Sequence, residues 1–179
     1  MIFVTGATGY TGRWVVGELL RRKISVTCLV RETSDVGHLT RDGVPYVRAN
    51  IEHVDQWSPA LAGARAVISV AHIRYAPFVV EACRKQAVSR VVFFSSTWRF
   101  SKVVTPAVEA VCLGEDAVLR SGLAYTLLRP TMIYGPGDDR NISRLLGFIK
   151  RKRVLPIFGS GEQPIQPVFV ADVAKAAVD

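Results

Sequence analysis

Short apolar runs alternate with amphipathic segments along the whole chain. Most of the apolar runs are continuous, which is typical of strands in a parallel sheet covered on both faces. The predicted strands are Met1–Thr5, Ser25–Val30, Pro45–Arg48, Ala66–Val70, Val91–Ser95, Ala124–Leu128 and Val154–Phe158. The predicted helices are Tyr10–Arg22, Val54–Ala62, Pro77–Gln86, Ala107–Ser121 and Asn141–Lys150, with a short crossover at Ser34–Thr40. This alternation predicts an α/β fold with a doubly wound parallel sheet, helices on both faces and a single domain over residues 1–179.

A glycine-rich turn joins the first predicted strand to the first predicted helix. Gly6, Gly9 and Gly12 are spaced three apart. The missing Cβ atoms allow a tight turn and close approach of a pyrophosphate, and the helix would direct free N–H groups at that phosphate. No Gly-Lys-Ser/Thr follows, so the loop is not a mononucleotide P-loop. The pattern predicts a dinucleotide-binding site; the alternative is a glycine-rich turn that binds nothing.

The spacing G-x-x-G-x-x-G, written TGATGYTG here, resembles the extended and atypical short-chain dehydrogenases/reductases, including epimerase/dehydratase-like and NmrA-like members. The segment Y-T-L-L-R-P-x-x-I-Y-G-P from Tyr125 to Pro136 and the segment Val168–Ala176 resemble the same family. The resemblance covers Met1 to Ala177 and implies a Rossmann fold that binds NAD(P). Family members usually continue with further substrate-binding elements, so the C-terminal substrate part is expected to be truncated or minimal.

The residues that we expect to bind the cofactor lie in the glycine-rich loop and at the ends of the strands. The end of the second strand meets the adenosine ribose in such sheets. Arg31 stands there in place of a carboxylate, and Arg31 with Ser34 favours NADP(H) over NAD(H), although Glu32 leaves NAD open. The resemblance places further residues at the pyrophosphate, adenine, ribose and nicotinamide. The full expected set is Gly6, Thr8, Gly9, Tyr10, Thr11, Gly12, Arg31, Ser34, Asn50, Ile51, Ala71, His72, Ser95, Pro130 and Ile133.

The chemistry of the site is less clear from the residues. The family holds the substrate oxygen with a Ser or Thr after the fifth strand and moves the proton with a Tyr-x-x-x-Lys pair on the next helix. That pair is absent, because Ala107 and Val111 occupy its places. Ser96 and Lys102 are the remaining catalytic candidates, and His72 is either a general acid or base or a residue that borders the cofactor.

Three classes of function therefore remain. The first is an NAD(P)-dependent oxidoreductase or epimerase of the epimerase/dehydratase type, acting on a nucleotide-sugar or another carbonyl substrate. The second is a non-catalytic NADP(H)-binding sensor, similar to NmrA-like proteins. The third is an assembly or scaffold protein, similar to the family member attached to respiratory complex I.

The charge and composition of the chain limit the kinds of partner that we expect it to bind. The net charge is +8, and part of it lies in Lys150–Arg153, which would face either an acidic partner or only solvent. No nucleic-acid module accompanies this cluster, so nucleic acid is not expected. Three cysteines without a C-x-x-C pattern indicate neither a metal site nor a disulfide framework. No apolar run reaches about 18 residues, so we expect a cytoplasmic protein that neither spans nor binds a membrane and acts on a small-molecule substrate. The resemblance suggests a homodimer.

Overall fold

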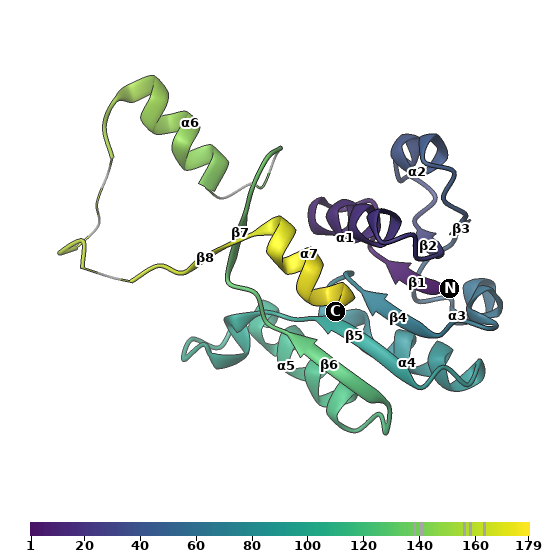
Figure 1. Cartoon of the computed structure of the whole chain (residues 1–179). Coiled ribbons are helices and arrows are strands. Elements are labelled where there is room, and N and C mark those ends of the chain that lie inside the picture. Colours follow the sequence, from purple (N-terminus) through teal and green to yellow (C-terminus); the bar gives the residue numbers. More distant parts are fainter. Residues whose placement is uncertain (138, 140–141, 156, 158, 163) are drawn as a thin grey trace.

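The computed structural model describes residues 1–137, 139, 142–155, 157, 159–162 and 164–179. Its main sheet contains six parallel strands in the order β3-β2-β1-β4-β5-β6 (Figure 1). The strands are β1 (Ile2–Thr5), β2 (Val26–Val30), β3 (Tyr46–Arg48), β4 (Ala66–Ser69), β5 (Arg90–Phe94) and β6 (Ala124–Leu128). This order is that of the Rossmann fold, and the chain crosses from one side of β1 to the other after β3. The predicted fold class is confirmed.

Helices cover both faces of this sheet, which explains the continuous apolar strands. The helices are α1 (Tyr10–Arg21), α2 (Gly37–Arg41), α3 (Val54–Trp57), α4 (Ala76–Lys85), α5 (Pro106–Leu119), α6 (Ile142–Lys152) and α7 (Val170–Val178). Three 3₁₀ turns complete the set: η1 (Ser58–Leu61), η2 (Ile73–Tyr75) and η3 (Thr97–Phe100). The predicted helix Val54–Ala62 is thus a single α-turn followed by a 3₁₀ turn.

The side chains of β1 show how the two faces divide. Phe3 points to one face, where it stacks on Trp57 of α3 with ring centroids 5.9 Å apart and joins α4 and α5 in one apolar cluster. Val4 points to the other face and packs in a second cluster with α1, α2 and α7. Successive residues of a strand point to opposite faces. Each strand therefore needs apolar residues in sequence, with no polar alternation.

The last third of the chain adds a segment outside the main sheet, which we call the arm. It consists of β7 (Met132–Tyr134), α6 and β8 (Pro167–Phe169). β7 and β8 pair in parallel as a small second sheet, and α6 stands away from the main sheet (Figure 1). The predicted strand Val154–Phe158 is wrong where it can be checked, because Val154, Leu155 and Ile157 are not in a strand. Its remaining residues, and Asn141 of the predicted helix, lie outside the described residues.

No helix among the described residues is both long enough and apolar enough to cross a membrane. The longest of them, α5, has 14 residues. A membrane-spanning helix needs about 20 apolar residues.

Candidate functional site

The glycine turn occupies the carboxyl end of β1, where open α/β sheets bind ligands. Gly6 has φ +73°, and a Cβ there would lie 2.6 Å from the backbone nitrogen of Ala71. A Cβ on Gly12 would lie 2.0 Å from the carbonyl oxygen of Gly6. The first contact closes the loop against the end of β4, and the second allows α1 to start directly against it. The glycines are therefore required by backbone packing at these two positions.

The N-terminus of α1 supplies the donors of this turn. Gly9 is the N-cap, and no side chain caps the helix. The first intrahelical bond runs from the N–H of Arg13 to the carbonyl oxygen of Gly9, at 3.0 Å. The N–H groups of Tyr10, Thr11 and Gly12 precede it and have no intrahelical acceptor. With the positive end of the helix dipole, they form a site suited to a phosphate.

A cavity of about 330 Å³ lies on one side of the loop, at the ends of β1, β2, β3 and β4. Its polar lining comes from the loop after β2 and from the residues that follow β3 and β4. The expected residues that line it are Gly6, Thr8, Gly9, Arg31, Ser34, Asn50, Ile51, Ala71 and His72. Glu32, the alternative ribose partner, is exposed and does not border this cavity.

The loop after β2 is held in place from two directions. The guanidinium of Arg48 donates to the carbonyl oxygens of Arg31, at 3.2 Å, and Glu32, at 2.7 Å. The hydroxyl of Thr8 donates to the hydroxyl of Ser34 at 3.4 Å, which joins this loop to the glycine turn. Both contacts fix the backbone that carries Arg31 and Ser34 at the cavity wall.

A second cavity, of about 290 Å³, lies on the other side of the loop, between β4, β5 and the start of the arm. The two cavities share five residues, among them Gly6 and Gly9. The expected residues that line this second cavity are Gly6, Gly9, Tyr10, Thr11, Gly12, Ala71, His72, Ser95, Ser96, Pro130 and Ile133. We refer to it as the nicotinamide-side cavity and to the first as the adenosine-side cavity, after the groups that the family resemblance leads us to expect there.

Glu115 is fully buried, and its carboxylate holds Ser95 in the wall of the nicotinamide-side cavity. Glu115 of α5 receives two hydrogen bonds of 2.8 Å from Arg129, which follows β6, and one of 2.5 Å from the hydroxyl of Ser95. Burial raises the pKa of Glu115, but the hydrogen bonds from Arg129 and Ser95 outweigh burial and hold the pKa below its usual range. Arg129 thus anchors the end of β6 to α5 through Glu115. The joint role of Glu115 was not recognised from the sequence.

His72 forms the wall common to both cavities. Its Nδ1 accepts a hydrogen bond of 3.2 Å from the backbone N–H of Arg74. Burial, followed by the charge of Arg74, lowers the pKa of His72 below its ordinary value of 6.5. The imidazole is therefore neutral at pH 7 and is a poor source of protons there.

The remaining candidates for proton transfer are few. Val111 lines the nicotinamide-side cavity at the place of the family lysine, so the fold brings an apolar side chain to that position. Ser96 also lines the cavity, and its hydroxyl oxygen accepts from the N–H of Trp98 at 3.2 Å. Lys102 is exposed in the following loop and lines neither cavity. The hydroxyl of Tyr10 is buried without a hydrogen-bond partner among the described residues.

Arg74 and Tyr75 are among the wall residues that were not anticipated from the sequence. Arg74 and Tyr75 line the adenosine-side cavity, and the guanidinium carbon of Arg74 lies 4.6 Å from the ring centroid of Tyr75. They belong to a 3₁₀ turn that carries no motif. The sequence signal that could have identified them is their position shortly after His72, which was itself an expected cavity residue.

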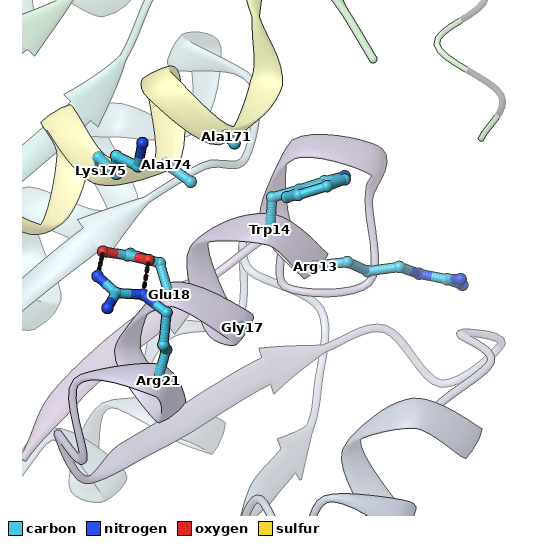
Figure 2. A pocket seen from close by; sticks show the side chains of 8 residues that line it. All are labelled: Arg13, Trp14, Gly17, Glu18, Arg21, Ala171, Ala174 and Lys175. Carbon is cyan, nitrogen blue, oxygen red and sulfur yellow. Dashed lines mark hydrogen bonds and ion pairs between the residues drawn. The ribbon is translucent and has the colours of Figure 1, made fainter. Parts of the chain in front are cut away.

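A third cavity, of about 470 Å³, lies away from the strand ends, between α1 and α7 (Figure 2). Trp14, Ala171 and Ala174 form its apolar part, and charged side chains surround it. Figure 2 shows Arg21 paired with Glu18 at its edge, at 2.7 Å. Its other cations, Arg13 and Lys175, also face carboxylates, which leaves little charge for a ligand.

Cys28, Cys83 and the acidic residues that the structure describes give no second centre. Burial raises the pKa of Cys28 and Cys83 to about 12, so neither thiol is a nucleophile at neutral pH. Within the described residues, no cluster of three His, Cys, Asp or Glu side chains could hold a metal ion.

The fold and this crevice define a dinucleotide-binding protein. The chain belongs to the NAD(P)H-binding family, whose model matches residues 6–152.

Relatives of this chain include both an enzyme and a subunit of a larger complex. It is 25% identical over 211 residues to the 2-alkyl-3-oxoalkanoate reductase of Stenotrophomonas maltophilia, a match that covers 98% of this chain and 63% of the reductase. It is 27% identical over 195 residues to the Arabidopsis thaliana mitochondrial NADH dehydrogenase [ubiquinone] 1 alpha subcomplex subunit 9, covering 98% of this chain and 48% of that subunit. The chain thus spans only about half to two thirds of these relatives.

Solved structures agree on the fold. The Thermotoga maritima UDP-glucose 4-epimerase superposes with a TM-score of 0.80 at 22% identity, over 99% of this chain and 72% of the epimerase. An NADPH-dependent quinone oxidoreductase from Escherichia coli superposes with a TM-score of 0.77, also at 22% identity, over 99% of this chain and 62% of the oxidoreductase. At this identity the likeness concerns the fold and not the reaction.

Proposed function

We propose that this chain, as one domain over residues 1–179, binds NADP(H) extended across the two cavities, with the pyrophosphate at the glycine turn. The observation that carries the proposal is the meeting of both cavities at Gly6 and Gly9, beneath the uncapped N-terminus of α1. Two anionic phosphates would accept from the N–H groups of Tyr10, Thr11 and Gly12. The residues present therefore fit the group.

The preference for NADP(H) rests on the charge at the adenosine-side cavity. Arg31 and Ser34 border this cavity and Glu32 does not. A guanidinium can pair with both oxygens of a 2′-phosphate, whereas a carboxylate in that place would repel it. Asn50 and Ile51 would border the adenine at the far end of the cavity.

We assign to the chain a reductase or epimerase-type reaction on a carbonyl substrate, a nucleotide-sugar being one candidate. When bound, the nicotinamide supplies or accepts the hydride. Ser95, Pro130 and Ile133 would position the ring. The Ser96 hydroxyl, whose oxygen accepts from Trp98, retains its hydrogen to donate to a substrate oxygen. Lys102 lies outside the lining of both cavities, so it would contribute positive charge only to a substrate that extends beyond them.

A second function is favoured by one observation. The resemblance puts Ala107 and Val111 at the positions of the proton-transferring pair, and burial together with Arg74 lowers the pKa of His72. A site that can bind NADP(H) but lacks proton donors is what we expect of a non-catalytic NADP(H) sensor or of an assembly subunit. The reductase and the complex subunit among the relatives leave both functions open.

Calorimetry separates binding from reaction. We expect saturable heat with NADPH and a weaker signal with NADH. Absence of heat with both dinucleotides would disprove the binding site itself. NADPH oxidation would then be followed by absorbance with a panel of carbonyl compounds.

Turnover that falls in Ser96→Ala and Lys102→Ala, and not in the neighbouring Ser101→Ala, would support the reaction. Firm binding without turnover would favour the sensor or scaffold. Turnover that survives both substitutions would remove Ser96 and Lys102 from the mechanism.

A further inference from the structure

Arg48 is the last residue of β3, the edge strand of the main sheet, and it lines neither of the two cavities. It lies opposite Val30, the last residue of β2, in the register of the two strands. The loop that carries Arg31 begins at the next position of the chain. The pairing of β2 with β3 therefore brings the Arg48 side chain beside this loop.

A single nitrogen of Arg48 contacts three carbonyl oxygens of the loop. Its Nη1 lies 2.7 Å from the oxygen of Glu32, 3.2 Å from that of Arg31 and 3.4 Å from that of Ser34. The oxygen of Arg31 also accepts from the N–H of Ser34 at 3.0 Å, which closes a turn over residues 31–34. Three carbonyl oxygens that face one another would repel, and a guanidinium between them makes charge-assisted hydrogen bonds instead. Arg48 thus stabilises this particular conformation of the loop.

The guanidinium of Arg48 is supported in turn by Tyr46. Residues two apart on a strand point to the same face, and the guanidinium carbon of Arg48 lies 5.5 Å from the centroid of the Tyr46 ring. Both side chains are exposed, so neither belongs to the apolar core. The contacts of Arg48 therefore bear on the loop and hardly on the stability of the sheet.

We propose that Arg48 is a positioning residue that sets the preference for NADP(H) over NAD(H), acting through Arg31 and Ser34. The proposal rests on the proposed dinucleotide function, because these two residues border the cavity where the 2′-phosphate would lie. Arg48 lies outside the lining of that cavity, so the oxygens that it holds are turned away from the anion. It also fixes the backbone that carries Arg31, which reduces the entropy lost when the guanidinium meets the phosphate. NAD(H) has a neutral hydroxyl at this place and gains much less from either effect.

A direct attraction between Arg48 and the phosphate is the alternative explanation. The two differ in what they require. A direct attraction would act whatever residues stand at positions 31 and 34, whereas a positioning role needs the side chains that the loop presents. A double-mutant comparison separates the two, because residues that act as one unit are not additive.

Titration calorimetry of the full chain with NADPH and with NADH tests the proposal. Arg48→Ala should weaken NADPH binding about fivefold, the value of roughly one charge-assisted hydrogen bond, and NADH binding less than twofold. The retained NADH binding also shows that the variant is folded. Arg48→Lys keeps a charged donor and should recover part of the loss. Arg65→Ala is the matched control, because it removes an exposed cation just before β4, at the opposite end of the strands, and should leave both affinities unchanged.

The same substitution is then made in a chain that already carries Arg31→Ala and Ser34→Ala. There Arg48→Ala should change NADPH affinity by less than twofold. A full fivefold loss in that background would show that Arg48 acts on the phosphate by its own charge, and would overturn the proposal. Equal weakening of NADPH and NADH by Arg48→Ala, or no weakening of either, would also overturn it while leaving dinucleotide binding intact. A wild-type chain that binds neither dinucleotide would refute the proposed function and this role together.

Discussion

The two cavities share the glycine turn and the residues that follow β4, and differ in the rest of their lining. The adenosine-side cavity is bordered by Arg31, Ser34 and Asn50, whose polar groups can reach a ligand. The nicotinamide-side cavity is bordered mainly by apolar side chains, including Val111, and its Ser95 hydroxyl is already bonded to Glu115.

This difference indicates that dinucleotide binding and proton transfer depend on different residues of the same crevice. The groups proposed to hold a dinucleotide are backbone N–H donors and residues at the ends of β1 to β4. The groups that would move protons in the family belong to β5 and α5, where the resemblance puts Ala107 and Val111 of this chain at the places of the Tyr and Lys. Changes on one side should therefore alter properties that changes on the other side leave intact.

The largest effect is expected on the nicotinamide side. Glu115→Ala should lower the free energy of unfolding by about 3 kcal/mol, because Arg129 and Ser95 lose a fully buried partner. The estimate is at the lower end for a broken buried pair, since the Arg129 side chain is 32% exposed and can regain water. Denaturant unfolding at pH 7 measures it.

Glu109→Ala on the same helix is the control, because Glu109 is exposed and should cost far less. Equal losses in both variants would show that the network around Glu115 contributes nothing beyond the helix itself.

The shared turn gives the next largest effect. Gly12→Ala should weaken NADPH binding about 100-fold, since a Cβ 2.0 Å from the Gly6 oxygen forces the loop or the helix to move. Gly17→Ala on the same helix meets nothing within 4 Å and should leave affinity unchanged. Titration calorimetry compares the two. Unchanged affinity in Gly12→Ala would mean that the ligand does not use this turn.

The sheet could be predicted from the sequence because its strands are continuous apolar runs bounded by turns. The six strands and their helices follow that pattern closely. The arm could not, because β7 and β8 are only three residues long and pair with each other across 35 positions. The apolar segment Val154–Phe158 has strand composition, yet composition does not specify a pairing partner.

Some residues of the candidate site could likewise be predicted from the sequence and others could not. The glycine turn and Arg31 carry motifs, so their places were predicted. Arg74 carries no motif, and only the fold brings it to the cavity wall. The hydrogen bonds of Glu115 join the end of β5, α5 and the end of β6, and no local sequence pattern predicts such a contact.

A smaller effect tests the adenosine side. Arg31→Ala should weaken NADPH binding about tenfold by removing a charged contact to the 2′-phosphate. NADH, which lacks that phosphate, should bind as to the wild type. Arg41→Ala serves as the control for net charge. If both dinucleotides weaken equally, Arg31 holds a feature common to the two, and the preference for NADP(H) is lost.

The smallest effect concerns His72, which belongs to both sides. Its pKa is lowered from 6.5 by burial and by Arg74, so its neutral form predominates above pH 6.5 and adds little positive charge for an anionic ligand. NADH affinity should therefore change by less than about twofold between pH 6.5 and 8.0. NADH is the better probe here, because the 2′-phosphate of NADPH itself titrates close to this range. Protonation near neutral pH would instead strengthen binding as the pH falls. A rise of that kind in the wild type, absent from His72→Gln, would show that His72 carries a proton at pH 7 and would restore it as a candidate acid.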